Sequence, residues 1–193
     1  MKNLKYLILI LFSFILLINN AKATENSEIE NFIENFSAEF EKISKLKTKK
    51  EKEDATYDLA NKILDLNWIG NFILGKNRNS FDENTKKDFI KYYSKSLIKN
   101  YISFLDSYKK ENYKILKIEK KKENLFMVDT EIKLQDKSVN NTFRITKKNN
   151  IYYITDIITE GISFISNQRM EIESIISNGK FDEFMEKLKK ENI

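Results

Sequence analysis

The sequence predicts an α+β domain in which helices come first, a four-stranded antiparallel meander follows, and helices return at the end. Apolar residues recur at three- and four-residue steps as far as about residue 108, which is typical of amphipathic helices. From Tyr113 to about Ile158 they alternate with polar residues, and helical spacing returns after Gly161. The sequence contains no internal repeat and no low-complexity linker, so we expect residues 24–193 to form a single domain.

The first 23 residues have the pattern of a secretory signal peptide. Two lysines precede an apolar run from Tyr6 to Ile18, and the small-residue pattern Ala-Lys-Ala ends at Ala23. The run is shorter than the roughly 20 apolar residues that span a membrane. An uncleaved anchor is the alternative. We expect residues 1–23 to be removed and the rest of the chain to be exported.

The composition argues against several classes of function. The chain has 34 basic and 29 acidic residues, but three of the lysines lie in residues 1–23, so the remaining domain is close to neutral. A near-neutral, mixed surface gives little support for nucleic-acid binding. The sequence has no histidine and no cysteine. This excludes catalysis by Ser-His or Cys-His pairs, zinc sites built on histidine, and disulfides. We therefore expect no metal and no cofactor.

Three helices are predicted in the first part of the domain. Asn26 and Ser27 can cap the first, which begins near Glu28. Its apolar stripe is Ile29, Phe32, Ile33, Phe36, Phe40 and Ile43. Thr48–Glu53 is predicted to be a charged connector, followed by a helix from about Glu51 to Asp65 whose apolar face is Ala55, Leu59, Ile63 and Leu66. A short helix from Trp68 to Leu74 is expected to end at Gly75, because glycine commonly ends helices.

The longest helix is predicted from about Glu83 to Tyr108, with Asp82 as its N-cap. Every fourth residue on it is apolar or aromatic: Phe89, Tyr93, Leu97, Tyr101 and Leu105. Ile90, Ile98 and Phe104 widen this face beyond what a helix facing solvent needs. We therefore expect the helix to pack on two sides.

Four strands and two final helices are predicted after Tyr113. Polar breaks at Glu123-Asn124, Asp136-Lys137 and Asn149-Asn150 separate the strands, and such short connections indicate a meander. The helices are expected from about Phe164 to Ser177, before Gly179, and from Phe181 to Lys190.

Two stretches resemble a known family. In DLNWIGNFILGKNRNSFDENTKKDFIKYYSKSLIKNY, from Asp65 to Tyr101, the pair Leu74-Gly75 ends a short helix and a long helix follows. DIITEGISFISNQRMEIESIISNGKFDEFMEKL runs from Asp156 to Leu188. Its matching positions are Asp156, Gly161, Ser163, Asn167 and Arg169. Together with the order of elements, these stretches make the chain similar to the MlaC family over essentially all of residues 24–193. Arg78 and Glu83 depart from the family, which usually has an aromatic residue and often has proline at these positions.

The resemblance implies a soluble periplasmic carrier of phospholipid. Family members enclose a deep apolar cavity between helices and sheet, with the acyl tails inside and the headgroup near solvent. They exchange lipid with an outer-membrane lipoprotein–porin complex and an inner-membrane ABC transporter, which maintains the lipid asymmetry of the outer membrane. Such a carrier is not an enzyme, and the lack of histidine and cysteine agrees with that expectation.

The candidate cavity lining combines apolar residues of the long helix and of the strands. It consists of Phe89, Tyr93, Leu97, Tyr101, Leu105, Phe126, Val128, Ile132, Phe143, Ile145, Tyr153 and Ile157. Periodicity alone does not distinguish a cavity from an ordinary filled core. Gly75, Asp156, Gly161, Asn167 and Arg169 are expected to be structural, with Arg169 paired to Asp156 or to a carboxylate on a helix.

Two other functions remain as alternatives. One is a periplasmic scaffold that binds only protein and has a filled core. The other is a hydrolase or isomerase that would have to use residues such as Asp129 or Glu131, which alternate with Lys133 as a solvent-facing ladder does. We expect a monomer, because no exposed apolar stripe is left unassigned.

Overall fold

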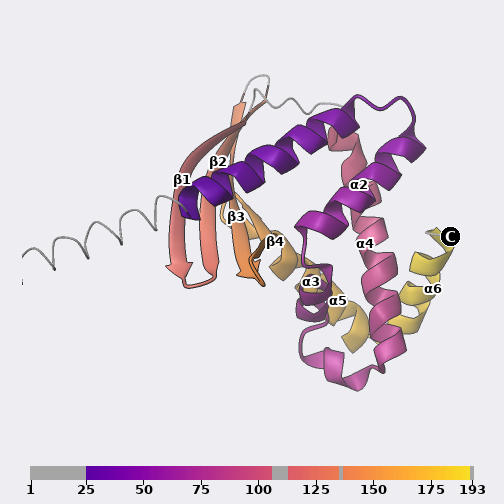
Figure 1. Cartoon of the computed structure of the whole chain (residues 1–193). Coiled ribbons are helices and arrows are strands. Elements are labelled where there is room, and N and C mark those ends of the chain that lie inside the picture. The colour runs from indigo at the N-terminus through magenta and orange to yellow at the C-terminus, as the bar shows by residue number, and fades with distance from the viewer. Residues whose placement is uncertain (1–24, 106–112, 135–136, 192–193) are drawn as a thin grey trace, which may run out of the picture. The chain divides into compact units, whose positions relative to one another are not determined.

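The computed structural model describes residues 25–105, 113–134 and 137–191 (Figure 1). The chain divides into two compact units, Met1–Asn35 and Phe36–Ile193. The predicted signal peptide, residues 1–23, lies outside the described residues. Among the residues described, no helix is both long enough and apolar enough to cross a membrane.

The N-terminal helix covers residues 25–44 and is already helical at Glu25, three residues before its predicted start. Ile29, Ile33 and Ile43, three positions of its predicted stripe, are buried. The periodicity therefore identified the helix and its apolar side.

Helix α2 (Lys49–Ile63) begins earlier than predicted. The side chain of Thr48 accepts a hydrogen bond from the backbone N–H of Glu51 (3.2 Å), and the Glu51 carboxylate accepts one from the backbone N–H of Thr48 (3.0 Å). This reciprocal capping box fixes the helix start at Lys49. The prediction of a connector over Thr48–Glu53 is therefore wrong, because most of that segment is the first turn of α2.

Helix α3 (Leu66–Leu74) starts two residues before its predicted first residue, because Asp65 caps it by accepting from the backbone N–H of Trp68 (3.1 Å). Leu66, predicted on the preceding helix, is thus the first residue of α3. The helix ends at Gly75 as expected, with φ of 59° and ψ of −134°, a conformation open almost only to glycine. A 3₁₀ helix, η1 (Gly75–Ser80), follows.

Helix α4 (Glu83–Leu105) is the predicted long helix. One carboxylate oxygen of Asp82 accepts from the backbone N–H groups of Asn84 (2.8 Å) and Thr85 (3.0 Å), and the other accepts from the Thr85 hydroxyl (2.6 Å). These hydrogen bonds, the Thr85 hydroxyl first, lower the pKa of the Asp82 carboxyl. The predicted end of the helix at Tyr108 lies outside the described residues.

The sheet is antiparallel throughout, in the order β1-β2-β3-β4-β5. Its strands are β1 (Tyr113–Lys122), β2 (Leu125–Leu134), β3 (Lys137–Lys148), β4 (Ile151–Thr159) and β5 (Ile162–Ser163). The predicted meander of four strands is corrected to five. Positive φ angles at Glu160 (49°) and Gly161 (81°) turn the chain back, so that Ser163 pairs with Ile158.

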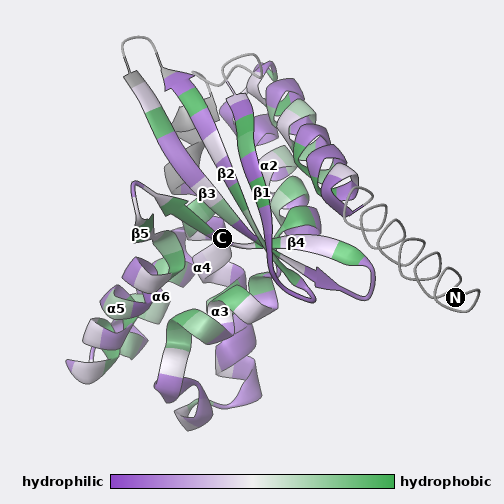
Figure 2. Cartoon of the chain, turned by 90° about the vertical axis from the view of Figure 1, so that its left-hand side faces the viewer, coloured by the Kyte–Doolittle hydropathy of each residue, from purple (hydrophilic) through white to green (hydrophobic). Residues whose placement is uncertain are grey.

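Helices α5 (Phe164–Ser177) and α6 (Phe181–Glu191) complete the α+β architecture that the sequence predicted. In Figure 1 the sheet lies to one side of helices α2 to α6. Figure 2 shows hydrophilic and hydrophobic residues alternating along the strands, while α3 is mostly hydrophobic. The sheet thus has one apolar and one polar side, as an antiparallel sheet with one covered face should have.

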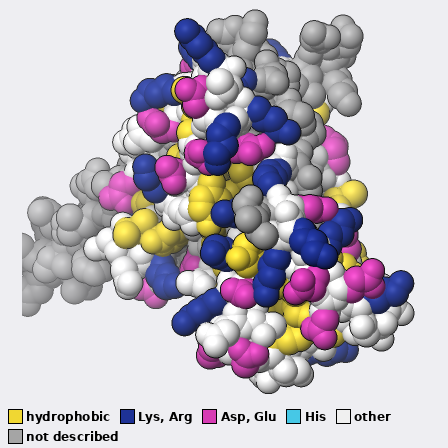
Figure 3. Space-filling view, turned by 90° about the vertical axis from the view of Figure 1, so that its right-hand side faces the viewer, with side chains coloured by type: hydrophobic (Ala, Val, Ile, Leu, Met, Phe, Trp, Pro, Cys, Tyr) yellow, Lys and Arg dark blue, Asp and Glu magenta, His cyan; other side chains and the backbone are white. Residues whose placement is uncertain are grey.

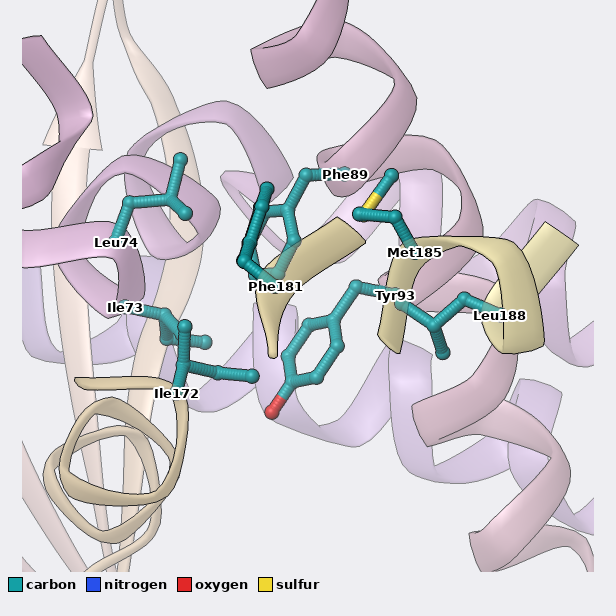
Figure 4. Close-up of a cluster of buried hydrophobic side chains, with 8 residues drawn as sticks. All are labelled: Ile73, Leu74, Phe89, Tyr93, Ile172, Phe181, Met185 and Leu188. Carbon is teal, nitrogen blue, oxygen red and sulfur yellow. The ribbon is translucent and has the colours of Figure 1, made fainter. Parts of the chain in front are cut away.

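A helical core forms where α3, α4, α5 and α6 meet (Figure 4). Its buried side chains are Ile73, Leu74, Phe89, Tyr93, Ile172, Phe181, Met185 and Leu188. The rings of Phe89 and Tyr93 stack with their centroids 4.8 Å apart, and the ring of Phe181 lies 6.0 Å from that of Phe89. The Tyr93 hydroxyl donates to Gln168 on α5. Aromatic pairs at these separations add to the stability gained from burial.

Candidate functional site

The apolar face of the sheet consists of Phe126, Val128, Ile132, Phe143, Ile145, Ile154 and Ile157. Cross-strand pairing puts these residues on one side, since partners in an antiparallel sheet point the same way. Phe126 pairs with Ile145, which pairs with Ile154. In the next row Val128 pairs with Phe143, which pairs with Ile157. Five predicted lining residues of β2 and β3 are therefore neighbours on one surface.

The burial of the apolar face falls along the strands. Phe126, Val128 and Ile145 are fully buried, and Phe143 is nearly so, with the ring of Phe36 packed edge-on against it at 5.7 Å between centroids. At the other end Ile132 is only half-buried, and Ile157 has 37% of its surface exposed. The apolar face is thus closed at one end and accessible from solvent at the other.

A polar row crosses the apolar face beside the row that contains Ile157, and its member on β2, Thr130, is fully buried. Thr130 pairs with Asn141, which pairs with Thr159. The Thr130 hydroxyl donates to the backbone carbonyl of Asn141 (3.0 Å), and the Thr159 hydroxyl donates to the Asn141 side-chain oxygen (2.6 Å). The face therefore changes from purely apolar to mixed polar within one row of residues.

A β-bulge decides which residues of β4 belong to the apolar face. Ile145 pairs with Ile154 and Arg144 with Asp156, so Thr155 is an extra residue. The bulge places Thr155 and Asp156 on the same side as Arg144 and returns Ile157 to the side of Ile154. Tyr153, predicted to line the cavity together with Ile157, pairs with Thr146 on the opposite side. The structure does not bring Tyr153 together with the apolar face.

The predicted lining residues of α4 lie in a different place. Phe89 and Tyr93 are buried in the helical core, and Leu97 packs against that core. The side chains of Tyr101 and Leu105 lie outside the described residues. The described part of the long helix thus contributes to helix packing, and its role as a cavity wall stays a prediction.

Asp156 organises the junction between the sheet and α5. Its carboxylate is buried and accepts from the Ser163 hydroxyl (2.7 Å) and from the backbone N–H of Ile165 (3.2 Å). Arg144 lies 3.5 Å from the same carboxylate. The ion-pair partner of Asp156 is therefore Arg144, on the neighbouring strand, and of the two partners expected for Arg169 the first, Asp156, is corrected.

Arg169 instead joins two motifs that are far apart in the sequence. Its guanidinium lies over the ring of Phe72, 5.2 Å from the centroid. A Cβ atom added to Gly75 would stand 2.8 Å from the Arg169 Nε atom, so the guanidinium packs directly on the glycine. The Leu74-Gly75 pair and Arg169 of the second motif thus form one contact. The other two residues expected to be structural, Gly161 and Asn167, lie exposed, in the turn before β5 and on α5.

Two open grooves lie on the other side of the sheet. The larger, of about 870 Å³, is bounded by Trp68, the β1–β2 turn and the β3–β4 turn. The smaller, of about 480 Å³, lies between Tyr57, Ile90 and Tyr153. Neither groove is lined by the apolar face. The predicted deep cavity over that face therefore stays a prediction.

Asp129, one of the carboxylates named for a possible enzyme, lies on the polar side of the sheet. Asp129 accepts a hydrogen bond from the Thr142 hydroxyl (2.7 Å) on the polar side of the sheet. Within the described ranges, no group of three or more acidic side chains is arranged to hold a metal ion. Seen from the side of α4 and α6, acidic and basic side chains are intermingled, with apolar atoms showing between them (Figure 3). A surface of mixed charge is what a solvated face requires.

Comparison with known proteins identifies the family. The family model of the MlaC protein matches residues 31–190. No curated protein sequence matched the chain. Among solved structures, the phospholipid-binding protein from Ralstonia solanacearum, in complex with a phospholipid, matches with a TM-score of 0.68 and 13% identity. The match covers 86% of this chain and 96% of that one, and at such low identity it shows a shared fold. The chain described here belongs to the MlaC family.

Proposed function

We propose that the chain is a phospholipid carrier that holds acyl tails against the apolar face of the sheet. One observation carries the proposal: a continuous apolar surface on three strands is closed at Phe126 and accessible from solvent at Ile157. A tail entering at the accessible end would exchange water for apolar contacts at Ile157, and would reach Phe126 once the side chains that cover it move aside. The family match and the lipid-bound structure of similar fold support this proposal.

The energetics of lipid transfer explain why such a surface is needed. Burying a methylene group is worth about 0.8 kcal/mol, so exposing two acyl chains to water costs on the order of 20 kcal/mol. An apolar protein surface that replaces the bilayer interior removes most of this barrier. Transfer between membrane and carrier is then nearly balanced, and no nucleophile, base or metal is needed.

The polar row at Thr130, Asn141 and Thr159 suits the boundary between tail and headgroup. It crosses the apolar face where the exposure of Ile157 begins. The Thr130 and Thr159 hydroxyls already donate to Asn141, so the side-chain N–H groups of Asn141 are the donors that this row could offer to ester and phosphate oxygens without adding a charge. The tails would then lie toward Phe126, and the headgroup would lie near solvent.

We propose the periplasm as the site of action, with transport between an outer-membrane lipoprotein–porin complex and an inner-membrane ABC transporter. The basic start, apolar run and Ala-Lys-Ala ending at Ala23 support export with removal of residues 1–23. A carrier that works between two membranes would exchange its lipid with a docking partner at each of them.

Native mass spectrometry tests the carrier proposal. The full chain would be expressed in a Gram-negative bacterium, purified from the periplasm without detergent, and analysed intact, with the lipid then extracted. We expect a phospholipid adduct at one copy per protein, on a chain that begins at Thr24. A bare protein mass that also takes up no lipid from added vesicles would overturn the proposal.

A further inference from the structure

We propose that the larger groove, on the polar side of the sheet, is a docking site for an acidic segment of a partner protein. This surface is called the basic groove here, and it lies between Trp68 and the turns that join β1 to β2 and β3 to β4. Its position on the side opposite the apolar face leaves the proposed lipid site uncovered. The groove would be a docking surface for a partner protein of the proposed carrier, so this proposal rests on the proposed function, but it does not require lipid to be bound.

The charge of the groove identifies the chemistry of the partner. Five basic residues line it, against two acidic ones. The basic residues are Lys121, Lys122, Arg144, Lys147 and Lys148, and the acidic residues are Asp65 and Glu123. Two further carboxylates border the groove, because Asp156 pairs with Arg144 and Glu119 pairs with Lys121, and the Lys147 ammonium lies over the Tyr152 ring. With these two carboxylates counted, basic residues exceed acidic ones by one. A concave surface with an excess of positive charge attracts ligands of negative charge.

The existing ion pairs leave part of that positive charge available. Lys148 lies 3.3 Å from the carboxylate of Asp65, so these two charges offset each other. Lys121 lies 2.6 Å from Glu119. Within the part of the chain that the structure describes, Lys122 has no acidic partner. A carboxylate arriving in the groove therefore meets a positive charge that no internal ion pair compensates.

Apolar side chains in the groove indicate a polypeptide and not a simple anion. Trp68 is 41% exposed and stacks on Phe72, with 5.3 Å between the ring centroids, so a partner would meet a rigid aromatic surface. Leu125 and Met127 are half-buried in the groove. Tryptophan, arginine and methionine are enriched where proteins bind one another, and methionine adapts its shape to different partners.

The groove is long enough for an extended segment because the smaller groove adjoins it. Both are lined by Asp65 and Lys148, so that ion pair stands at their common border. The smaller groove adds Lys87 and Lys91 from α4. A segment crossing the Asp65–Lys148 pair would therefore meet basic side chains on both sides of it.

The concave shape favours a polypeptide over the surface of an anionic membrane. Arg144 has a side chain only 33% exposed, and Thr155 is buried, yet both line the groove. A flat bilayer surface reaches protruding lysines but not groups inside a hollow, whereas a side chain of a bound segment does reach them. We therefore assign the groove to an acidic segment that also carries apolar residues.

Fluorescence of Trp68 tests the inference directly, because it is the only tryptophan of the chain. The probe is the capped peptide Glu-Glu-Leu-Phe-Glu-Glu-Leu-Glu, titrated into the full-length mature protein at low salt. We expect a saturable change in Trp68 emission that weakens as salt is added. The same peptide with lysine in place of every glutamate is expected to bind at least about tenfold more weakly.

Charge-reversal variants distinguish an effect of the groove from an effect of the protein's net charge on peptide binding. Lys121→Glu with Lys122→Glu changes two exposed residues of the β1–β2 turn region, and Lys180→Glu with Lys190→Glu makes the same change at both ends of α6. We expect about tenfold weaker peptide binding in the first variant and little change in the second. Circular dichroism would check that both fold.

Three results would overturn the inference. They are equal weakening in both charge-reversal variants, equal affinity for the acidic and the basic peptide, and binding only to vesicles containing phosphatidylglycerol. Lipid occupancy is measured separately by native mass spectrometry. A failure of peptide binding would therefore contradict the docking site but not the carrier proposal. A lipid-free protein that still binds the peptide would contradict the carrier proposal but not the docking site.

Discussion

The helical core and the apolar face of the sheet are built from the same kinds of residue, but they differ in how completely neighbouring side chains cover them. Every buried member of the helical core, from Ile73 to Leu188, has at most 6% of its surface exposed. The apolar face ranges from 0% at Phe126 to 37% at Ile157. Helices α3, α4, α5 and α6 each contribute side chains to one closed cluster, whereas the sheet presents a broad surface that is incompletely covered at one end.

This difference in coverage suits the helical core to stabilising the fold and the apolar face to binding a ligand. A closed cluster of stacked rings leaves no room for a ligand, and its close packing makes the loss of even one methyl group costly. An apolar surface with an accessible end has unsatisfied contacts that a ligand can supply. The comparison therefore predicts large losses of stability from changes in the helical core, and losses of lipid with little loss of stability from changes at Ile157.

The largest effect is expected for Phe89→Ala. Phe89 is fully buried and contacts the rings of both Tyr93 and Phe181, so its removal leaves a cavity among rigid neighbours. Substitutions of this kind cost about 3–5 kcal/mol. Urea unfolding followed by far-UV circular dichroism measures the loss. A loss below about 1 kcal/mol, the range of surface changes, would mean that the core is not closed.

Gly75→Ala is expected to cost about 1–3 kcal/mol, because the backbone angles at Gly75 suit almost no other residue. The contact with Arg169 allows the two causes to be separated. If backbone strain dominates, Gly75→Ala costs nearly the same when Arg169 is also alanine. If the clash with the guanidinium dominates, the cost of Gly75→Ala largely disappears in the double variant. Urea unfolding of the two single variants and the double variant supplies the comparison.

The long helix, α5 and the alternation on β2 could be predicted from the sequence because each depends on local periodicity. The predicted bounds of α5, Phe164–Ser177, are those of the structure. The same local pattern placed Phe89 and Tyr93 on one face of α4, but it does not say which other element covers that face. The assignment of α4 to helix packing required the tertiary contacts with α5 and α6.

The β4 bulge shows why the rest of the candidate site could not be predicted. Simple alternation puts Tyr153 and Ile157 on one side of the strand, and a single extra residue at Thr155 puts them on opposite sides. The sequence around Thr155 contains no glycine or proline that would mark such a bulge. The pairing of Asp156 with Arg144 follows from the same shift, and so does the Ile157 position that the carrier proposal needs.

The bulge also supplies a matched pair of variants for the lipid site. Ile157→Glu and Ile151→Glu change the same residue type on the same strand, at exposed positions on opposite sides. A carboxylate at Ile157 would lie on the path proposed for an acyl tail, where burying a charge is unfavourable. We expect phospholipid content after detergent-free purification to fall about tenfold in Ile157→Glu, a difference of about 1.4 kcal/mol in binding.

The Ile151→Glu variant is expected to keep its lipid, since Ile151 lies beside the smaller groove. Both variants should unfold within about 1 kcal/mol of the parent protein, because the two positions are exposed. Equal loss of lipid in both variants would place the ligand elsewhere or indicate a general effect on folding.

The smallest effect concerns the pH dependence of the helical core, through Asp82 at the start of α4. Hydrogen bonds from Thr85 and Asn84 hold the pKa of the Asp82 carboxyl below its usual range. A carboxyl whose pKa is lower in the folded state contributes stability above its unfolded pKa, and loses it as pH falls through the folded pKa. Asn in place of Asp82 caps the helix without titrating. We therefore expect the urea midpoint of the parent protein to fall more steeply than that of Asp82→Asn below about pH 4. Parallel curves would show that the cap is not coupled to folding. Lipid content at neutral pH should be the same in both proteins, because α4 begins at the helical core and the proposed lipid site lies on the sheet.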